Sequence, residues 1–319
     1  MTTALDDTTI AERARPLLVW LSRQTEPVDL ELACAEHADP RLGSAHRVLV
    51  SMPTCLTAVP DHLLLELLVG GADRVHVRVD GCADPGVTRS RIDALCDVLE
   101  AVGQPPRLRV ETDLQVDATP RRVWDASHMP VSRRLLLPAP DDESRPLPLE
   151  TDSAHQRLVA AVARLRVAAT DLAEELAGPA IMLTAEGCTL CGVCVRACPE
   201  DALRVEDLDD SSQAPVTTVL RQRPSACNAC LDCVDLCPED VLVAGPPWPW
   251  AALLDEDDAD VAEITKATCA RCGVTFPASQ ERLCEVCAFR RANPFGSTLP
   301  PGAVARLDPR VARRLGHRV

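Results

Sequence analysis

The sequence predicts a parallel-sheet α/β domain at the N-terminal end, an α+β cysteine-rich domain in the second half, and a small domain of paired cysteines after it. Three observations support this prediction: strand and helix patterns alternate in the first third of the chain, one cysteine run occurs twice, and two further Cys-x2-Cys pairs follow. Alternating strands and helices are typical of βαβ units, whose strands pair in parallel. A chain of 319 residues is long enough for two or three domains.

The N-terminal pattern alternates between helical apolar periodicity and short runs rich in valine and leucine. Helices are expected at residues 6–24, 61–69 and 91–102, and strands at residues 48–51, 75–79 and 108–112. Pro60 and Asp61 begin the second helix, and Gly70 follows its end, as is typical of helix boundaries. Residues 113–150 lack periodicity and are expected to form a connector. A long helix is expected at 153–177, ended by Gly178 and Pro179.

These patterns divide the chain into seven segments. They are an N-terminal helical segment (1–45), an α/β domain (46–115), a connector with the long helix (116–180), the cysteine-rich domain (181–246), an acidic Pro/Trp linker (247–262), the domain of paired cysteines (263–295) and a basic tail (296–319). The tail contains five arginines and one acidic residue. It is expected to be a solvated charged tail; the alternative is a docking peptide for an acidic partner or for the acidic face of the chain's own cysteine-rich domain.

The chain is acidic, with a formal net charge of −15. Nucleic acids and anionic lipids bind proteins through neutralisation of their own negative charge, so we expect neither as the main partner. The first ten residues lack the features of an export signal, and no apolar run approaches the ~20 residues that span a bilayer. A soluble, cytoplasmic protein is therefore expected. In a reducing compartment its sixteen cysteines favour metal binding over disulfides.

A cysteine run with the spacing C-x2-C-x2-C-x3-C-P occurs twice. The first copy consists of Cys188, Cys191, Cys194 and Cys198, and the second of Cys227, Cys230, Cys233 and Cys237. Each cysteine of the second copy lies 39 residues after its counterpart (188 to 227, 198 to 237), so the segment is an internal duplication. Zinc sites use two pairs of ligands rather than runs of three plus one, which argues against eight zinc-binding cysteines.

In this spacing three cysteines wrap one cubane and the fourth ligates the other cluster. We therefore predict two [4Fe–4S] clusters. The first is assigned to Cys188, Cys191, Cys194 and Cys237, and the second to Cys227, Cys230, Cys233 and Cys198. The segment resembles bacterial-type dicluster ferredoxins over about sixty residues, and the resemblance implies an electron relay. Its acidic side chains outnumber its basic ones, which favours partners with basic surfaces.

Four later cysteines have the spacing C-x2-C-x11-C-x2-C. They are Cys269, Cys272, Cys284 and Cys287. Two such pairs make a tetrahedral four-sulfur site, for which Zn2+ is the usual ion, and we predict a zinc-ribbon-like domain. A single iron ion has the same ligand set and stays the alternative. The segment has little apolar material of its own, so the metal is expected to hold it folded.

The remaining cysteines lie in the N-terminal third. Cys55 and Cys82 follow two expected strands, where open α/β sheets place their sites, whereas Cys96 lies in an expected helix. The stretch 46–112 resembles the hydrogenase iron–sulfur (delta) subunit family, on Cys55, the Gly71-Ala72-Asp73 turn and Gly81-Cys82. The resemblance implies a [2Fe–2S] cluster and partners of the hydrogenase or formate dehydrogenase type. The family has an upstream Cys-x2-Cys pair where this chain has Cys34 with His37, so Cys34, Cys55 and Cys82 are the candidate ligands, and a scaffold without a cluster is the alternative.

The function expected from these features is that of an iron–sulfur electron-transfer subunit or adaptor within a larger cytoplasmic redox complex. The sequence contains no Gly-rich phosphate loop, no nucleophile-elbow serine and no HExxH motif, so we expect no independent catalytic site. One alternative is an iron–sulfur redox sensor that uses the zinc domain and the arginine-rich tail. Another is an oxidoreductase that binds a nucleotide in its N-terminal α/β domain.

Overall fold

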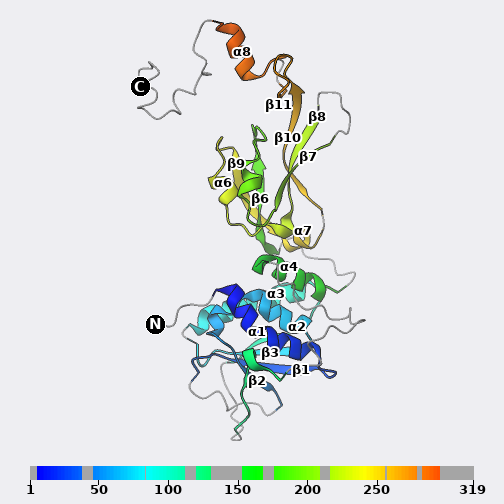
Figure 1. The fold of residues 1–319 in the computed structure, drawn as a ribbon. Helices are drawn as coiled ribbons and strands as arrows, with labels where there is room; N and C mark the ends of the chain where they lie inside the picture. Colours follow the sequence, from blue (N-terminus) through cyan, green and yellow to red (C-terminus); the bar gives the residue numbers. More distant parts are fainter. Residues whose placement is uncertain are drawn as a thin grey trace, which may run out of the picture. The chain divides into compact units, whose positions relative to one another are not determined.

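The computed structural model describes residues 6–37, 46–82, 84–111, 120–130, 153–167, 176–208, 216–255, 257–278 and 282–294 (Figure 1). The chain divides into two compact units. The first, here called the N-terminal unit, comprises Met1–Ala180 and Pro247–Glu256. The second, here called the cysteine-rich unit, comprises Ile181–Pro246 and Asp257–Val319. The predicted basic tail lies outside the described residues.

A five-stranded parallel sheet forms the centre of the N-terminal unit. Its strands are β1 (Val28–Ala33), β2 (Val48–Ser51), β3 (Ala72–Arg78), β4 (Leu108–Glu111) and β5 (Trp124–Asp125). They lie in the order β4-β3-β1-β2-β5, and every neighbouring pair is parallel. The prediction of a parallel-sheet α/β region is confirmed. Strand β1 was not predicted, although it is the central strand of the sheet and four of its six residues are buried.

The helices of this unit are α1 (Asp7–Ser22), α2 (Asp61–Val69), α3 (Pro85–Ala101), α4 (Ala154–Leu165) and α7 (Trp250–Leu254), with short 3-10 turns η1 (Leu56–Ala58) and η2 (Ala126–His128). Helices α1, α2 and α3 lie over the sheet, whereas α4 packs against α2 and α7 contacts α4 (Figure 1). Helix α1 buries Ile10, Leu17 and Leu21 at helical spacing, and the Asp6 side chain caps it by accepting from the Thr9 N–H at 2.7 Å.

Two helices differ from their predicted bounds. Helix α3 begins at Pro85, six residues early, because Asp84 caps it and Pro85 occupies its first turn, where a missing N–H costs nothing. Helix α4 ends at Leu165, twelve residues before the predicted end. Arg166 is already extended, residues 168–175 lie outside the described residues, and Gly178 and Pro179 belong to strand β6 (Ala177–Ala185) rather than ending a helix.

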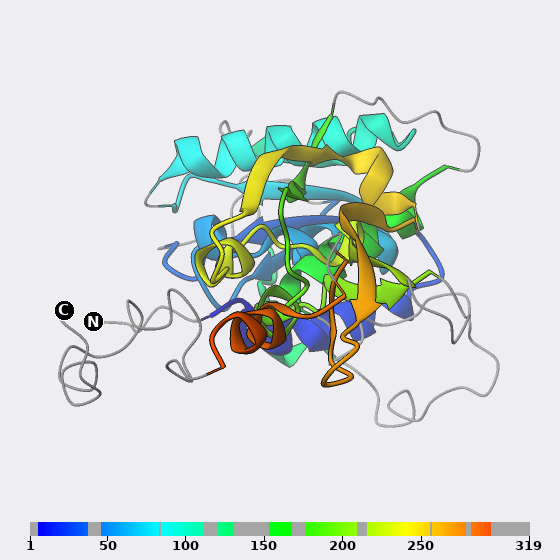
Figure 2. The ribbon, with the colours of Figure 1, turned by 90° about the horizontal axis from the view of Figure 1, so that it is seen from above.

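The cysteine-rich unit contains an antiparallel sheet and very short helices. Its sheet has the order β11-β10-β8-β7, with β7 (Leu203–Asp207), β8 (Val216–Gln222), β10 (Ala259–Thr268) and β11 (Thr275–Pro277). The helices are α5 (Val193–Ala197), α6 (Asp232–Asp235) and α8 (Glu285–Ala292), with the 3-10 turn η4 (Pro224–Ala226). Seen from above, β10 and β11 lead into α8, drawn in orange (Figure 2). Among the described residues, seven buried ones form its core, including Leu183, Leu220 and Leu242.

The segment predicted to be an acidic linker has regular structure instead. Residues 245–249 belong to strand β9 (Leu242–Pro249), which pairs with β6 in a two-stranded sheet. Trp250 and Leu253 are buried on α7, so the Pro/Trp segment contributes to a core. Asp258 pairs with Arg204 at 2.6 Å just before β10 begins. Among the described residues, no helix has the length and apolar character of a membrane span.

Candidate metal centres

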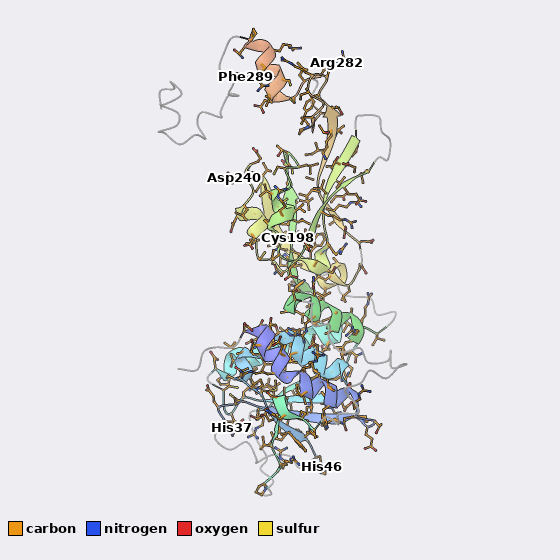
Figure 3. The ribbon with its side chains drawn as sticks, viewed as in Figure 1. His37, His46, Cys198, Asp240, Arg282 and Phe289 are labelled. Carbon is orange, nitrogen blue, oxygen red and sulfur yellow. The ribbon has the colours of Figure 1, made fainter. Side chains whose placement is uncertain are left out.

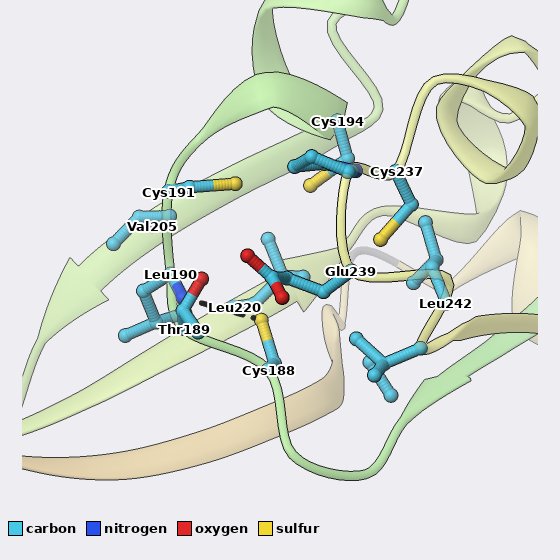
Figure 4. A pocket seen from close by; sticks show the side chains of 13 residues that line it. Cys188, Thr189, Leu190, Cys191, Cys194, Val205, Leu220, Cys237, Glu239 and Leu242 are labelled. Atoms are coloured by element: carbon cyan, nitrogen blue, oxygen red, sulfur yellow. Dashed lines mark hydrogen bonds between the residues drawn. The ribbon is translucent and has the colours of Figure 1, made fainter. Parts of the chain in front are cut away.

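The first pocket of the cysteine-rich unit brings together one thiol from the second cysteine run and three from the first. Its thiols belong to Cys188, Cys191, Cys194 and Cys237. The sulfur atoms surround a common space (Figure 4). Leu190, Val205 and Leu220 line the same pocket, so its wall is largely apolar. These four cysteines are the set that the sequence assigned to one cluster.

The second pocket is the counterpart of the first. Its thiols belong to Cys198, Cys227, Cys230 and Cys233. Cys198, which is labelled in Figure 3, comes from the first run and the other three come from the second. The wall again includes apolar side chains, here Leu183, Leu203 and Leu231. Each pocket thus contains three cysteines of one run and the fourth of the other, as the crossed assignment requires.

The two loops around the pockets share an unusual backbone conformation. Left-handed residues occur in pairs that lie 39 positions apart: Leu190 with Ala229 (φ 53° and 58°), Gly192 with Leu231 (70° and 67°), and Asp201 with Asp240 (52° and 53°). A residue with a Cβ pays roughly 1 kcal/mol or more for this conformation. The strain is repeated at equivalent positions because the same tight turn is needed around each pocket.

Backbone N–H groups point at several of these thiols. The N–H of Leu190 donates to Cys188 Sγ at 3.4 Å, and the N–H of Ala202 donates to Cys198 Sγ at 3.2 Å. Burial raises the pKa of Cys237, but the N–H groups of residues 239–242 outweigh burial and the net pKa lies below the ordinary value. Burial raises the pKa of Cys233 to about 12. N–H donors favour a thiolate, the form that binds metal.

These features fit a [4Fe–4S] cluster in each pocket. Four cysteine thiolates are the ligand set of such a cluster, and hydrogen bonds to sulfur and a dry wall are among the features that tune it. Both pockets provide four thiols, and both have N–H donors at sulfur and apolar walls.

One acidic residue, which no sequence motif indicated, distinguishes the two pockets. Glu239 lines the first pocket, and its carboxylate points toward the space between the sulfur atoms (Figure 4). Its counterpart in the duplication, Glu200, instead accepts a hydrogen bond from Asn228 Nδ2 at 3.3 Å and is not among the residues that line the second pocket. The two Cys-Pro-Glu-Asp motifs are identical in sequence, so the repeat alone did not reveal this difference.

The four cysteines of the zinc-ribbon-like segment also converge. They are Cys269, Cys272, Cys284 and Cys287, whose sulfur atoms all lie within 4.8 Å of one another. Cys269 follows β10, Cys284 directly precedes α8, and the turn between the first pair and β11 uses Gly273 at φ 72°. The Sγ atoms of Cys272 and Cys284 are 3.7 Å apart. A tetrahedral zinc site with bonds of about 2.3 Å has sulfur–sulfur edges of about 3.8 Å, so the set fits this ion.

A hydrogen bond within this site already stabilises one thiolate. The Cys284 N–H donates to Cys269 Sγ at 3.3 Å and lowers the pKa of that thiol to about 6. Burial instead raises the pKa of Cys287 to about 12. This one hydrogen bond therefore favours the thiolate form of Cys269 and also links the first cysteine pair to the second.

Three cysteines of the N-terminal unit form a separate group, here called the thiol triad: Cys34, Cys55 and Cys82. Their sulfur atoms lie within 4.8 Å of one another. Cys34 is buried, the other two are half-buried, and burial raises the pKa of Cys82 to about 12. Cys96 is not part of the triad, because its Sγ donates to the Leu108 carbonyl oxygen at 3.4 Å.

Residues 187–241 match the family model of the 4Fe–4S dicluster domain. A search of curated proteins finds no match to this chain. The matched segment contains all eight cysteines of the two pockets and supports iron–sulfur electron transfer. It covers less than half of the chain, so it describes that segment alone. The cysteine-rich unit thus carries a 4Fe–4S dicluster domain.

Proposed function

We propose that this chain is an electron-transfer subunit or adaptor that relays single electrons through two [4Fe–4S] clusters within a larger redox complex. The observation that carries the proposal is the crossed composition of the two pockets, each with four thiols drawn from both runs. Crossed ligation would hold the two clusters close together in one folded module, which suits electron transfer between them.

The residues around each site have separate tasks in this relay. When bound, each cluster would accept and release one electron. The cysteines hold it, the apolar wall excludes water, and the N–H groups at Cys188 and Cys198 stabilise negative charge on sulfur. Cys191 and Cys230 are the exposed thiols of the two pockets, so each site has a side that a redox partner can approach.

The surface beside the second site suits a protein partner. Leu231 and Leu236 are 36% and 57% exposed, and Asp232 and Asp235 lie on the short helix between them. An apolar patch rimmed by acidic residues favours a partner with a basic rim, since complementary charge steers encounter. A hydrogenase- or formate dehydrogenase-type subunit is the partner that the resemblance of residues 46–112 favours.

The test is metal and sulfide analysis of anaerobically purified protein together with EPR of the reduced form. We expect about eight iron and eight sulfide per chain and a spin-coupled pair of [4Fe–4S] signals. The four-sulfur site adds one zinc. Four iron or fewer overturns the relay. Binding of DNA at low salt together with loss of the clusters in air would instead support a redox sensor.

A further inference from the structure

The thiol triad lies where three neighbouring strands end. Cys34 directly follows β1, Cys55 lies in the turn after β2, and Cys82 lies four residues after β3. These strands are adjacent in the order β3-β1-β2, and all are parallel, so their carboxyl ends meet at one edge of the sheet. This edge is where open α/β sheets place their sites.

The surrounding side chains hold this edge in place. Arg78 is 1% exposed, and its guanidinium donates to Glu31 Oε1 at 3.3 Å and to Asp80 Oδ2 at 2.7 Å. Asp80 Oδ2 also lies 2.8 Å from His37 Nε2, which ties the loop after β1 to the loop after β3. A Cβ added at Gly81 would lie 2.8 Å from the His37 ring, so the two loops are in close contact.

The triad does not fit the [2Fe–2S] cluster that the family resemblance implies. That cluster takes four protein ligands. Two of these ligands bind each of its two irons, and sulfur atoms on different irons lie farther apart than the 4.8 Å within which all three sulfur atoms of the triad lie. His37, the candidate next to Cys34 (Figure 3), is outside the group and engages Asp80 and Arg78 through Nε2.

We propose that Cys34, Cys55 and Cys82 bind a single Zn2+ ion through three thiolates, with the fourth position open to a ligand from solvent. The sulfur atoms are close enough for one ion to bridge all three, as tetrahedral zinc requires. Thiolate sets select zinc over harder cations such as Mg2+. Cys34 forms the buried base of the site, and Cys55 and Cys82, which are half-buried, leave one side accessible. Zinc sites with three protein ligands and an open position are the reactive kind.

The test is zinc and iron content of the full chain and of cysteine variants, purified anaerobically. We expect the wild type to contain one zinc more than C55A, while C96A keeps the wild-type amount because Cys96 lies outside the triad. The iron content should be the same in all three proteins. The proposal is overturned if C55A contains as much zinc as the wild type. It is also overturned if C55A contains about two iron fewer than the wild type and lacks a [2Fe–2S] EPR signal that the wild type shows. A low iron content in every protein would instead count against the relay.

Cobalt substitution provides a second measurement that does not depend on C55A folding well. In the C269A/C272A chain the zinc-ribbon-like site has lost one cysteine pair, so cobalt bound to thiolates reports the triad. We expect a thiolate-to-cobalt charge-transfer band in this chain, and its loss when C82S is added. Cys82 is half-buried and serine is nearly isosteric, so this change preserves packing. Absence of the band in the C269A/C272A chain overturns the proposal.

Discussion

The two units place cysteines on very different frameworks. In the N-terminal unit the thiols follow the strands of a sheet whose residues, such as Leu30, Leu32 and Val77, are almost fully buried. In the cysteine-rich unit the two cluster loops contain helices of only four and five residues and repeated left-handed turns. A metal bound at the triad would therefore be an addition to a fold that already exists, whereas we expect the cysteine-rich unit to need its metals to complete the fold.

The largest effect is expected from removing cluster ligands, which also tests crossed ligation. C198A and C227A should each lower the iron content from about eight to about four, because each removes one ligand of the second site. The double variant C198A/C227A should also retain about four iron, since both changes affect the same cluster. C188A/C227A should retain almost none, because it removes one ligand from each site.

This experiment also tests the contrast between the units. All four tryptophans lie in the N-terminal unit, so their fluorescence reports that unit alone. In C188A/C227A the tryptophan unfolding transition should be unchanged while the cysteine-rich unit loses its structure by hydrogen exchange. An iron content near zero in C198A/C227A would contradict crossed ligation.

The second effect is loss of structure in the zinc-ribbon-like segment on metal removal. Structural zinc in such segments contributes about 10 kcal/mol or more of apparent folding free energy. A chelator, or C284A, should therefore abolish hydrogen-exchange protection in α8 and β11, whose ends meet at the four cysteines.

Protection of β1 and β3 serves as the control. These strands belong to the other unit, so their exchange rates should not change. Retained protection of α8 without metal would show that this helix folds on its own. It would contradict the idea that the cysteine-rich unit, unlike the N-terminal unit, needs metal to fold.

The cysteine sites were the part of the molecule most predictable from sequence. Metal ligands must be specific residue types at fixed spacing, so the eight cysteines from Cys188 to Cys237 could be divided before any fold was known into the two sets that line the pockets. Strand β1 was missed although VDLELA alternates apolar and acidic residues, because Asp29 and Glu31 are residue types that rarely occur in a central strand. Glu31 is buried there because Arg78 and Arg121 pair with it from other elements.

The linker prediction failed for a related reason. A segment rich in prolines and acids is usually exposed. Here, however, Trp250 is buried in a core, and the Asp258 carboxylate pairs with Arg204 and Arg223. Such partners are remote in sequence, so local composition could not reveal them. The convergence of the thiol triad likewise depends on the strand order β3-β1-β2, in which the unpredicted β1 occupies the centre.

A third, intermediate effect concerns pH and should affect the N-terminal unit. His62 is 2% exposed, and burial, with the nearby Arg157, lowers its pKa from 6.5 to about 3. The unfolded chain therefore takes up a proton that the native unit does not. The unfolding free energy is therefore unaffected by His62 above pH 6.5. Between pH 6.5 and pH 3 it falls by about 1.4 kcal/mol for each pH unit.

Urea unfolding followed by tryptophan fluorescence measures this effect. Between pH 7.5 and 5.5 the wild type should lose about 1.4 kcal/mol more unfolding free energy than His62→Leu. His128→Asn is the control, because the His128 side chain is 80% exposed and should retain the wild-type pH dependence. Equal pH dependence in wild type and His62→Leu would contradict this origin.

The smallest effect separates the two halves of the duplication. Glu239 lines the first pocket, whereas Glu200 is held by Asn228 and is absent from the lining of the second. A carboxylate close to a cluster opposes the added electron, so Glu239→Gln should raise the reduction potential of the first cluster. A change of about 1 kcal/mol corresponds to about 40 mV for one electron.

The measurement is an EPR redox titration in backgrounds that retain one cluster. C227A leaves the first cluster for Glu239→Gln, and C188A leaves the second for the matched variant Glu200→Gln, in which we expect a smaller shift. Both variants replace the same residue in the same Cys-Pro-Glu-Asp motif, so a difference between them must come from the surroundings of the two carboxylates. Equal shifts in reduction potential would mean that the two carboxylates have the same electrostatic effect on their clusters. Any difference between the potentials of the two clusters would then have to come from other features, such as the exposure of Cys191 and Cys230.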